Sequence, residues 1–218
     1  MGRRKLPPVA PESFVHITSR TCNGAWYPLA LNLIWEIYED HLYFLRHGLG
    51  AEIFGFVLMS NHSHLIARFP ENNMSYSMNI FQRDVSLEIN RLAGRKNQSF
   101  GGPYFPVLIK DSHHLDVAYR YLYQNPVRAG ICNSIFDYRF STLNVLFGKY
   151  KSAIPITVDA ISNHLHYDDN SRLWLDKLPP EHEALAVDKA FKKRIFELPV
   201  DRATRRVVNI GRAKLSKK

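Results

Sequence analysis

Two histidines, His62 and His64, stand one residue apart in an otherwise apolar stretch. Residues 54–59 before them and 65–67 after them have the apolar character of a strand. Side chains at positions i and i+2 of a strand project from the same face, so the two imidazoles would lie side by side. Two neutral imidazoles at this spacing can chelate a divalent cation. A pair of structural histidines, hydrogen-bonded inside a sheet, would show the same pattern.

A second group of reactive side chains lies in residues 118–130, AYRYLYQNPVRAG. Tyr121 and Asn125 are four residues apart and would share one face of a helix. Pro126 predicts that this helix ends directly after Asn125. If that face meets the two histidines, Asn125 can supply a third ligand and Tyr121 can approach a phosphate on the open side of the cation. The alternative is that the tyrosines only pack and cap a helix end.

The elements that must position these residues alternate between strand and helix patterns. Strands are expected at 13–19, 52–59, 62–69 and 104–110, and helices at 29–46, 74–92 and from 112 towards 125. This βαββαβα order predicts an α+β fold, a ferredoxin-like antiparallel sheet with helices on one face and the other face or an edge open for ligands. Around Ser60 the chain forms either a tight hairpin or a bulge in one strand.

The length and composition predict one sizeable domain with an appendage. The chain has 218 residues, of which 45% are hydrophobic, enough for a buried core. We expect a basic N-terminal arm at 1–12, the main domain at 13–150 and a mainly helical basic extension at 151–218. Within the extension, a helix is expected at 181–198, followed by a basic end that could bind phosphates.

The charge balance favours an anionic partner. Lys and Arg total 29 against 20 Asp and Glu, which gives a formal net charge of +9. Nucleic acid fits better than a membrane, because no apolar segment reaches the roughly 18 residues of a membrane span. The polar, basic start does not resemble a secretory signal, and two cysteines are too few for a disulfide framework. A cytoplasmic location is therefore expected.

The histidine and tyrosine segments together resemble the single-tyrosine HUH transposases, and most closely the REP-associated tyrosine transposases of bacteria. That family carries a strand motif L-M-P-N-H-x-H-L and a later helix motif Y-I-H-x-N-P-V-R-A-G. Here these read LMSNHSHL at 58–65 and YLYQNPVRAG at 121–130, and the resemblance covers about residues 13–145. Ser60 stands where the family usually has proline, which should loosen the turn before the histidines without removing a ligand.

The resemblance implies that His62 and His64 are metal ligands, that Asn125 is the third ligand and that Tyr121 is the nucleophile. The implied cofactor is Mg²⁺ or Mn²⁺, although two imidazoles also suit zinc or nickel. The implied activity is that of a transposase, a metal-dependent single-stranded DNA endonuclease and strand transferase that forms a 5′-phosphotyrosine intermediate. Its partner would be single-stranded or hairpin-forming repeat DNA, bound by a monomer or a homodimer.

Basic side chains near the predicted site and in the tail could bind DNA phosphates. These candidates are Arg20, Arg83, Lys110, Arg128, Arg205 and Arg206. Each could equally be solvated surface. Two further histidine positions are expected to be structural: His16 in the first strand, and the second Asn-His-x-His segment at 163–166, which is expected in a polar loop or at a helix cap.

Two other functions fit parts of the sequence. A binding-only descendant of these transposases would keep the basic surface and act as a repressor or repeat-binding protein. A metal-dependent hydrolase of small substrates would predict binding that is insensitive to salt, whereas DNA binding should weaken steeply as salt rises.

Overall fold

The computed structural model describes residues 9–96, 98–158, 169–201 and 205–211. Its sheet has the strands β1 (Phe14–Arg20), β2 (Glu52–Leu58), β3 (His62–Arg68) and β4 (Phe105–Ile109). The strands run in the order β2-β3-β1-β4, and each neighbouring pair is antiparallel. The predicted α+β class and the ferredoxin-like antiparallel sheet are confirmed.

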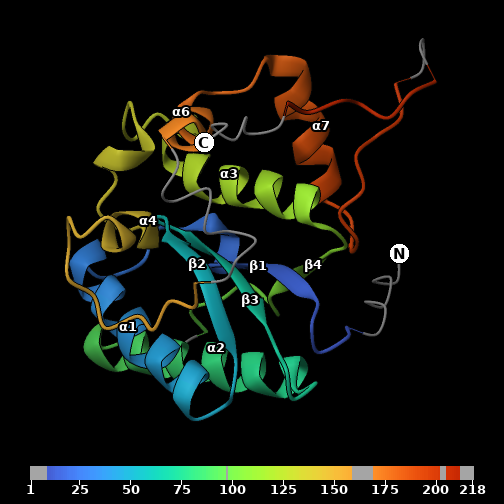
Figure 1. The fold of residues 1–218 in the computed structure, drawn as a ribbon. Coiled ribbons are helices and arrows are strands. Elements are labelled where there is room, and N and C mark those ends of the chain that lie inside the picture. The colour runs from blue at the N-terminus through green and yellow to red at the C-terminus, as the bar shows by residue number, and fades with distance from the viewer. Residues whose placement is uncertain (1–8, 97, 159–168, 202–204, 212–218) are drawn as a thin grey trace.

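Helices cover both faces of the sheet, not one. The pair α1 (Leu31–His47) and α2 (Met74–Leu92) packs on one face, and α3 (Ser112–Arg128) lies across the other (Figure 1). The reason is visible in the strands, whose central residues are apolar on both faces and so require two covers. The expectation of an open face was therefore wrong for most of the sheet.

Two hydrophobic cores follow from the alternation of side chains along each strand. On β1, Val15 and Ile17 point towards α1 and α2, whereas Phe14 points towards α3. His16 lies between Val15 and Ile17 in sequence and thus shares the α3 side with Phe14. Polar residues at alternate strand positions therefore face the helix that carries the tyrosines.

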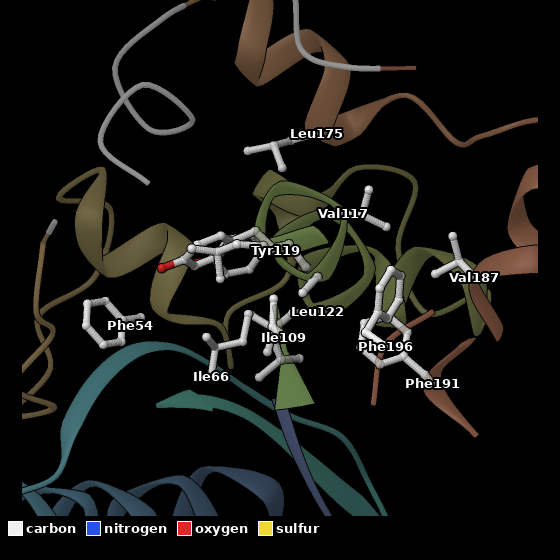
Figure 2. Close-up of a cluster of buried hydrophobic side chains, with 14 of the residues drawn as sticks. Phe54, Ile66, Ile109, Val117, Tyr119, Leu122, Leu175, Val187, Phe191 and Phe196 are labelled. Carbon is white, nitrogen blue, oxygen red and sulfur yellow. The ribbon is translucent and has the colours of Figure 1, made fainter. Parts of the chain in front are cut away.

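The C-terminal extension forms a further layer over α3. It contains α6 (Asp169–Asp176) and α7 (Glu181–Phe191), in line with the predicted helical character, and α7 ends earlier than the helix expected at 181–198. Its apolar side chains join the hydrophobic cluster around α3 (Figure 2), among them Leu175, Val187, Phe191 and Phe196. Short helices connect the layers: η1 (Cys22–Gly24), η2 (Ile135–Asp137) and α4 (Thr142–Leu146).

The end of α3 differs from the sequence expectation, because the helix continues through Pro126 to Arg128. Proline has no N–H to donate to the carbonyl of Leu122, four residues earlier. The side-chain nitrogen of Asn125 lies 3.3 Å from that carbonyl oxygen and donates to it instead. The helix then resumes, since the backbone N–H of Ala129 donates to the carbonyl of Asn125 at 3.0 Å.

The chain between β2 and β3 is a hairpin rather than a bulge within one strand. Its turn is tied to the segment after β1, because Tyr27 N donates to Ser60 O at 2.9 Å and Thr21 N donates to Asn61 O at 3.0 Å. Asn61 Nδ2 also donates to Gly24 O at 2.8 Å. These bonds hold the turn that Ser60 was expected to loosen. In the part of the chain that the structure describes, no helix is long and apolar enough to cross a membrane.

Candidate active site

The histidine pair and Tyr121 lie together between the sheet and α3. In β3, the rings of His62 and His64 have centroids 4.8 Å apart. The Tyr121 ring lies 5.9 Å from His64 and 5.8 Å from His16, in edge-on arrangements. These residues are far apart in the sequence, and strand pairing with the packing of α3 brings them into one site. All four residues belong to one chain.

His64 is held by a neighbour on the adjacent strand. Its Nδ1 lies 3.1 Å from Nε2 of His16 and 3.3 Å from the hydroxyl of Thr18. If Nδ1–H donates to His16, Nε2 of His64 carries the lone pair. That Nε2 is buried and has no hydrogen-bond partner in the described structure. A buried ring nitrogen without a partner suits a metal ligand.

His62 also has its lone pair on Nε2, and here a different partner determines the tautomer. Its Nδ1 lies 2.6 Å from Oδ1 of Asn61, and an amide oxygen can only accept. Nδ1 therefore carries the proton, and the lone pair is on Nε2. The two adjacent histidines thus both offer Nε2, which is the arrangement that a chelating pair needs.

The imidazoles are neutral at neutral pH, as metal binding requires. Burial lowers the pKa of His62 to about 4, with a further contribution from the charge of Arg20. Burial lowers the pKa of His16 to about 3. The pKa of His64 lies well below its ordinary value, first because of burial and then because of the neighbouring His16, His62 and two arginines.

Asn125 lies one turn beyond Tyr121 but is engaged with its own helix. Its Nδ2 donates to Tyr121 O at 2.7 Å as well as to Leu122 O. Across the described ranges, no group of three or more His, Cys, Asp or Glu side chains could hold a metal ion. A third protein ligand at the histidine pair would therefore be a different kind of donor, such as an amide, hydroxyl or backbone carbonyl oxygen. In the structure the Asn125 side chain donates to carbonyls of its own helix, and its role as ligand stays a prediction.

Tyr121 is covered by the C-terminal extension. The ring of Phe191, at the end of α7, stacks on it with centroids 4.2 Å apart and planes 25° apart. Arg128 stands over the same ring at 5.1 Å and forms an ion pair with Asp188 of α7 at 2.7 Å. Burial raises the pKa of Tyr121, as does the charge of Asp188, while Arg128 and Arg20 oppose that rise.

The predicted DNA-binding residues are dispersed over the described surface. Arg20 is the strand partner of His62 and lies at the site. Arg128 lies over Tyr121, but Arg83 pairs with Asp84 on α2 and Lys110 pairs with Glu197 of the extension. Arg205 and Arg206 are exposed in the last described segment. The second histidine segment, at 163–166, lies outside the described residues.

Three side chains at the site did not emerge from the sequence. Thr18 touches His64 because the register places these residues opposite each other, a relationship that period-2 counting along one strand does not reveal. Asp188 and Phe191 touch the site only because α7 folds back over α3. No local pattern in α7 distinguishes these two residues from an ordinary amphipathic helix.

The sequence matches no protein-family model, and no curated protein resembles it. A solved structure of a REP-associated tyrosine transposase bound to a REP hairpin has a similar fold, with a TM-score of 0.57 and 17% sequence identity. The match covers 83% of this chain and 100% of that one.

Proposed function

We propose that this protein is a metal-dependent single-stranded DNA endonuclease and strand transferase of the transposase type, with Tyr121 as its nucleophile. The observation that carries the proposal is the convergence of Tyr121 with His62 and His64. The similarity in fold to a transposase bound to hairpin DNA supports it from outside the site. The preferred substrate would be hairpin-forming repeat DNA.

Nε2 of His62 and Nε2 of His64 would hold the metal, and the orphaned Nε2 of His64 supports this fit. Asn125 would add its amide oxygen after a change of side-chain orientation. Bound Mg²⁺ or Mn²⁺ would polarise the scissile phosphate and partly neutralise its charge. Imidazole nitrogens suit Mn²⁺ better than Mg²⁺, so Mn²⁺ is expected to support more activity.

The chain's own contribution begins with Tyr121. Its Oη would form a bond to the phosphorus of a phosphodiester, and the bond from phosphorus to the 3′ oxygen would break. The phenol loses its proton to solvent, and the departing oxygen takes up a proton to become a 3′-hydroxyl. The product is a 5′-phosphotyrosine. Attack of a 3′-hydroxyl on this ester reverses the exchange, so strands can be rejoined without a nucleotide cofactor.

Burial raises the pKa of Tyr121 overall, and two arginines act against that rise. Arg128 and Arg20 lower the pKa of the phenol against the effect of burial. A phenol with an ordinary pKa of about 10 is a poor nucleophile at neutral pH, so such stabilisation matters. Arg20 and Arg128 also contribute positive charge where the phosphate would bind.

The test is a covalent-adduct assay. Wild-type protein and Tyr121→Phe are incubated with end-labelled single-stranded hairpin DNA and Mg²⁺ or Mn²⁺, and the adduct is resolved on a denaturing gel. We expect a metal-dependent adduct in the wild type alone. Tyr119→Phe is the matched control, because it removes a hydroxyl from the same helix at a position buried against the sheet. It should form the adduct.

Cleavage that persists in Tyr121→Phe would reject Tyr121 as the nucleophile. Loss of the adduct in both phenylalanine variants would point to disruption of α3 rather than to chemistry. Adduct formation that continues in the presence of a chelator would reject the metal.

A second candidate function is hairpin-DNA binding without cleavage. The stacking of Phe191 on Tyr121 favours it, because a covered phenol with a raised pKa is less reactive. The same experiment separates the two functions. Salt-sensitive binding of the hairpin, with no adduct under any metal condition, would select the binding protein.

A further inference from the structure

An exposed tryptophan with no assigned role lies on the segment that is hydrogen-bonded to the turn before the histidine pair. Trp26 is 77% exposed, more than any other large hydrophobic side chain in the described ranges. Single exposed hydrophobic side chains are common on protein surfaces, so the exposure of Trp26 gains meaning only from where its segment lies.

The segment that carries Trp26 is tied to the turn that precedes His62. Tyr27 N donates to Ser60 O, and Asn61 Nδ2 donates to Gly24 O. Within the segment, Asn23 and Gly24 both have positive φ, 54° and 67°, which folds the chain back after β1. Trp26 thus lies on a short loop that is hydrogen-bonded to this turn through residues on either side of it, Gly24 and Tyr27. These bonds set the position of the Trp26 backbone relative to the histidines.

Positive charge is available at the histidine site, at the end of the strand that leads into this segment. Arg20 is the strand partner of His62, and in the described structure it forms no ion pair. The segments that surround the site, 13–35, 53–70 and 89–110, contain no Asp or Glu at all. An anionic ligand would therefore meet Arg20 without repulsion from these three segments.

An exposed aromatic ring together with an unpaired arginine is the combination that proteins use to bind single-stranded nucleic acid, with the base on the ring and the phosphate on the cation. We propose that Trp26 is the stacking platform for an unpaired base beside the scissile phosphate, and that Arg20 binds the phosphate of that nucleotide. This inference rests on the proposed function. It adds the element that selects an unpaired strand, because a base inside a duplex cannot offer its face to the ring.

The test compares wild-type protein with Trp26→Ala in binding to a short oligothymidylate and to a duplex of the same length, in a chelator so that no cleavage occurs. We expect Trp26→Ala to weaken oligothymidylate binding by roughly 5- to 150-fold and to leave duplex binding unchanged. Trp26→Phe, which keeps a ring, should recover most of the loss. Tyr76→Ala is the matched control, since Tyr76 is 64% exposed on α2, across the sheet from the site.

Fluorescence provides a second readout. Oligothymidylate should quench the tryptophan emission of the wild type, and the quenching should disappear in Trp26→Phe, which retains Trp35 and Trp174. Equal oligothymidylate affinity in the wild type and Trp26→Ala would overturn the inference, as would an equal loss for single strand and duplex. A change in sedimentation without a change in DNA affinity would show that Trp26 contacts a second copy instead.

The outcomes also separate this inference from the proposed function. If the wild type binds and cleaves single-stranded DNA while Trp26→Ala does so equally well, the proposed function stands and the stacking role fails. If the wild type binds neither probe, the proposed function fails as well.

Discussion

Nε2 of His16 lies 3.1 Å from Nδ1 of His64, which joins the neighbouring strands β1 and β3 next to Tyr121. When Nδ1–H of His64 donates to His16, Nε2 of His64 is left for a metal. The contact also places a fully buried imidazole where a charged one could not be accommodated, since His16 is 1% exposed. Two predictions follow from the same pair.

The first concerns metal affinity. Replacing His16 with Leu removes the nearer of the two hydrogen-bond partners of His64 Nδ1, so the ring is oriented less firmly and loses part of its basicity. We expect Mn²⁺ affinity to fall roughly 10- to 100-fold, the usual effect of losing a hydrogen-bond partner of a ligand. Isothermal titration calorimetry with Mn²⁺ measures this. His16→Gln can still accept through its amide oxygen and should bind more tightly than His16→Leu. Equal affinity in the wild type and His16→Leu would contradict the orienting role.

The second concerns acid stability. The pKa of His16 is lowered by burial to about 3 in the folded protein, while the unfolded chain has the ordinary value of 6.5. Between these two values the unfolded state binds the extra proton, so the stabilisation is complete above pH 6.5 and is lost as pH falls towards 3. The loss amounts to about 1.4 kcal/mol for each pH unit, or about 2 kcal/mol at pH 5.

Urea unfolding of the metal-free protein at pH 7 and pH 5 measures that loss. In His16→Gln the loss should be smaller by about 2 kcal/mol, because glutamine does not titrate. His62 and His64, which also have lowered pKa values, will still contribute. An identical pH dependence in the wild type and His16→Gln would show that His16 does not remain neutral on folding.

Much of the fold could be predicted because its signals are local. The β-branched and apolar runs located all four strands, and apolar residues at helical spacing located α1, α2 and α3. The i, i+2 spacing of His62 and His64 was enough to place both imidazoles on one face of β3. That the two histidines lie near Tyr121 was expected only from the family resemblance. No local sequence pattern predicts which face of a sheet a later helix will cover.

What the sequence did not predict depends on contacts between distant segments. Apolar residues on both faces of the strands could have indicated two helical layers, but the βαββαβα order alone favoured one. The Asn125 side chain donates to the carbonyl of Leu122, which Pro126 leaves without its helical N–H donor. Helical spacing alone does not predict this hydrogen bond. Phe191 covers Tyr121 because the chain returns over α3, and its position in α7 resembles any other apolar site on that helix.

The third prediction concerns Asp188, which raises the pKa of Tyr121 and anchors Arg128. Asp188→Asn removes the negative charge and leaves the positive charge of Arg128 unopposed, so the pKa of Tyr121 should fall. Ultraviolet titration measures the ionisation of the tyrosines. Subtracting the curve of the double variant Asp188→Asn/Tyr121→Phe from that of Asp188→Asn isolates the ionisation of Tyr121. The cost in stability should be at most about 1 kcal/mol, because both partners are partly exposed. A rise in the Tyr121 pKa would show that Arg128 leaves the ring once its partner is gone.

The fourth prediction concerns the distance between α3 and β2, which is set at Gly55. A Cβ placed there would lie 3.0 Å from Cδ2 of Leu122 and 3.3 Å from the hydroxyl of Tyr123. Both neighbours are buried, so neither can move without shifting α3. Gly55→Ala should therefore destabilise the protein by roughly 1–3 kcal/mol.

The sign of this effect is diagnostic. Alanine loses less backbone entropy on folding than glycine, so in a strand with space for a methyl group the substitution would stabilise. Gly211→Ala provides the control, because a Cβ placed there meets no atom of the described residues, its chain neighbours aside, within 4 Å. Denaturant unfolding should give a lower midpoint for Gly55→Ala than for the control. Because the same shift would move Tyr121 relative to His64, the rate of adduct formation should fall as well. A midpoint equal to that of Gly211→Ala would show that α3 can withdraw from β2 at no cost, and that the tyrosine is less firmly positioned than this contact implies.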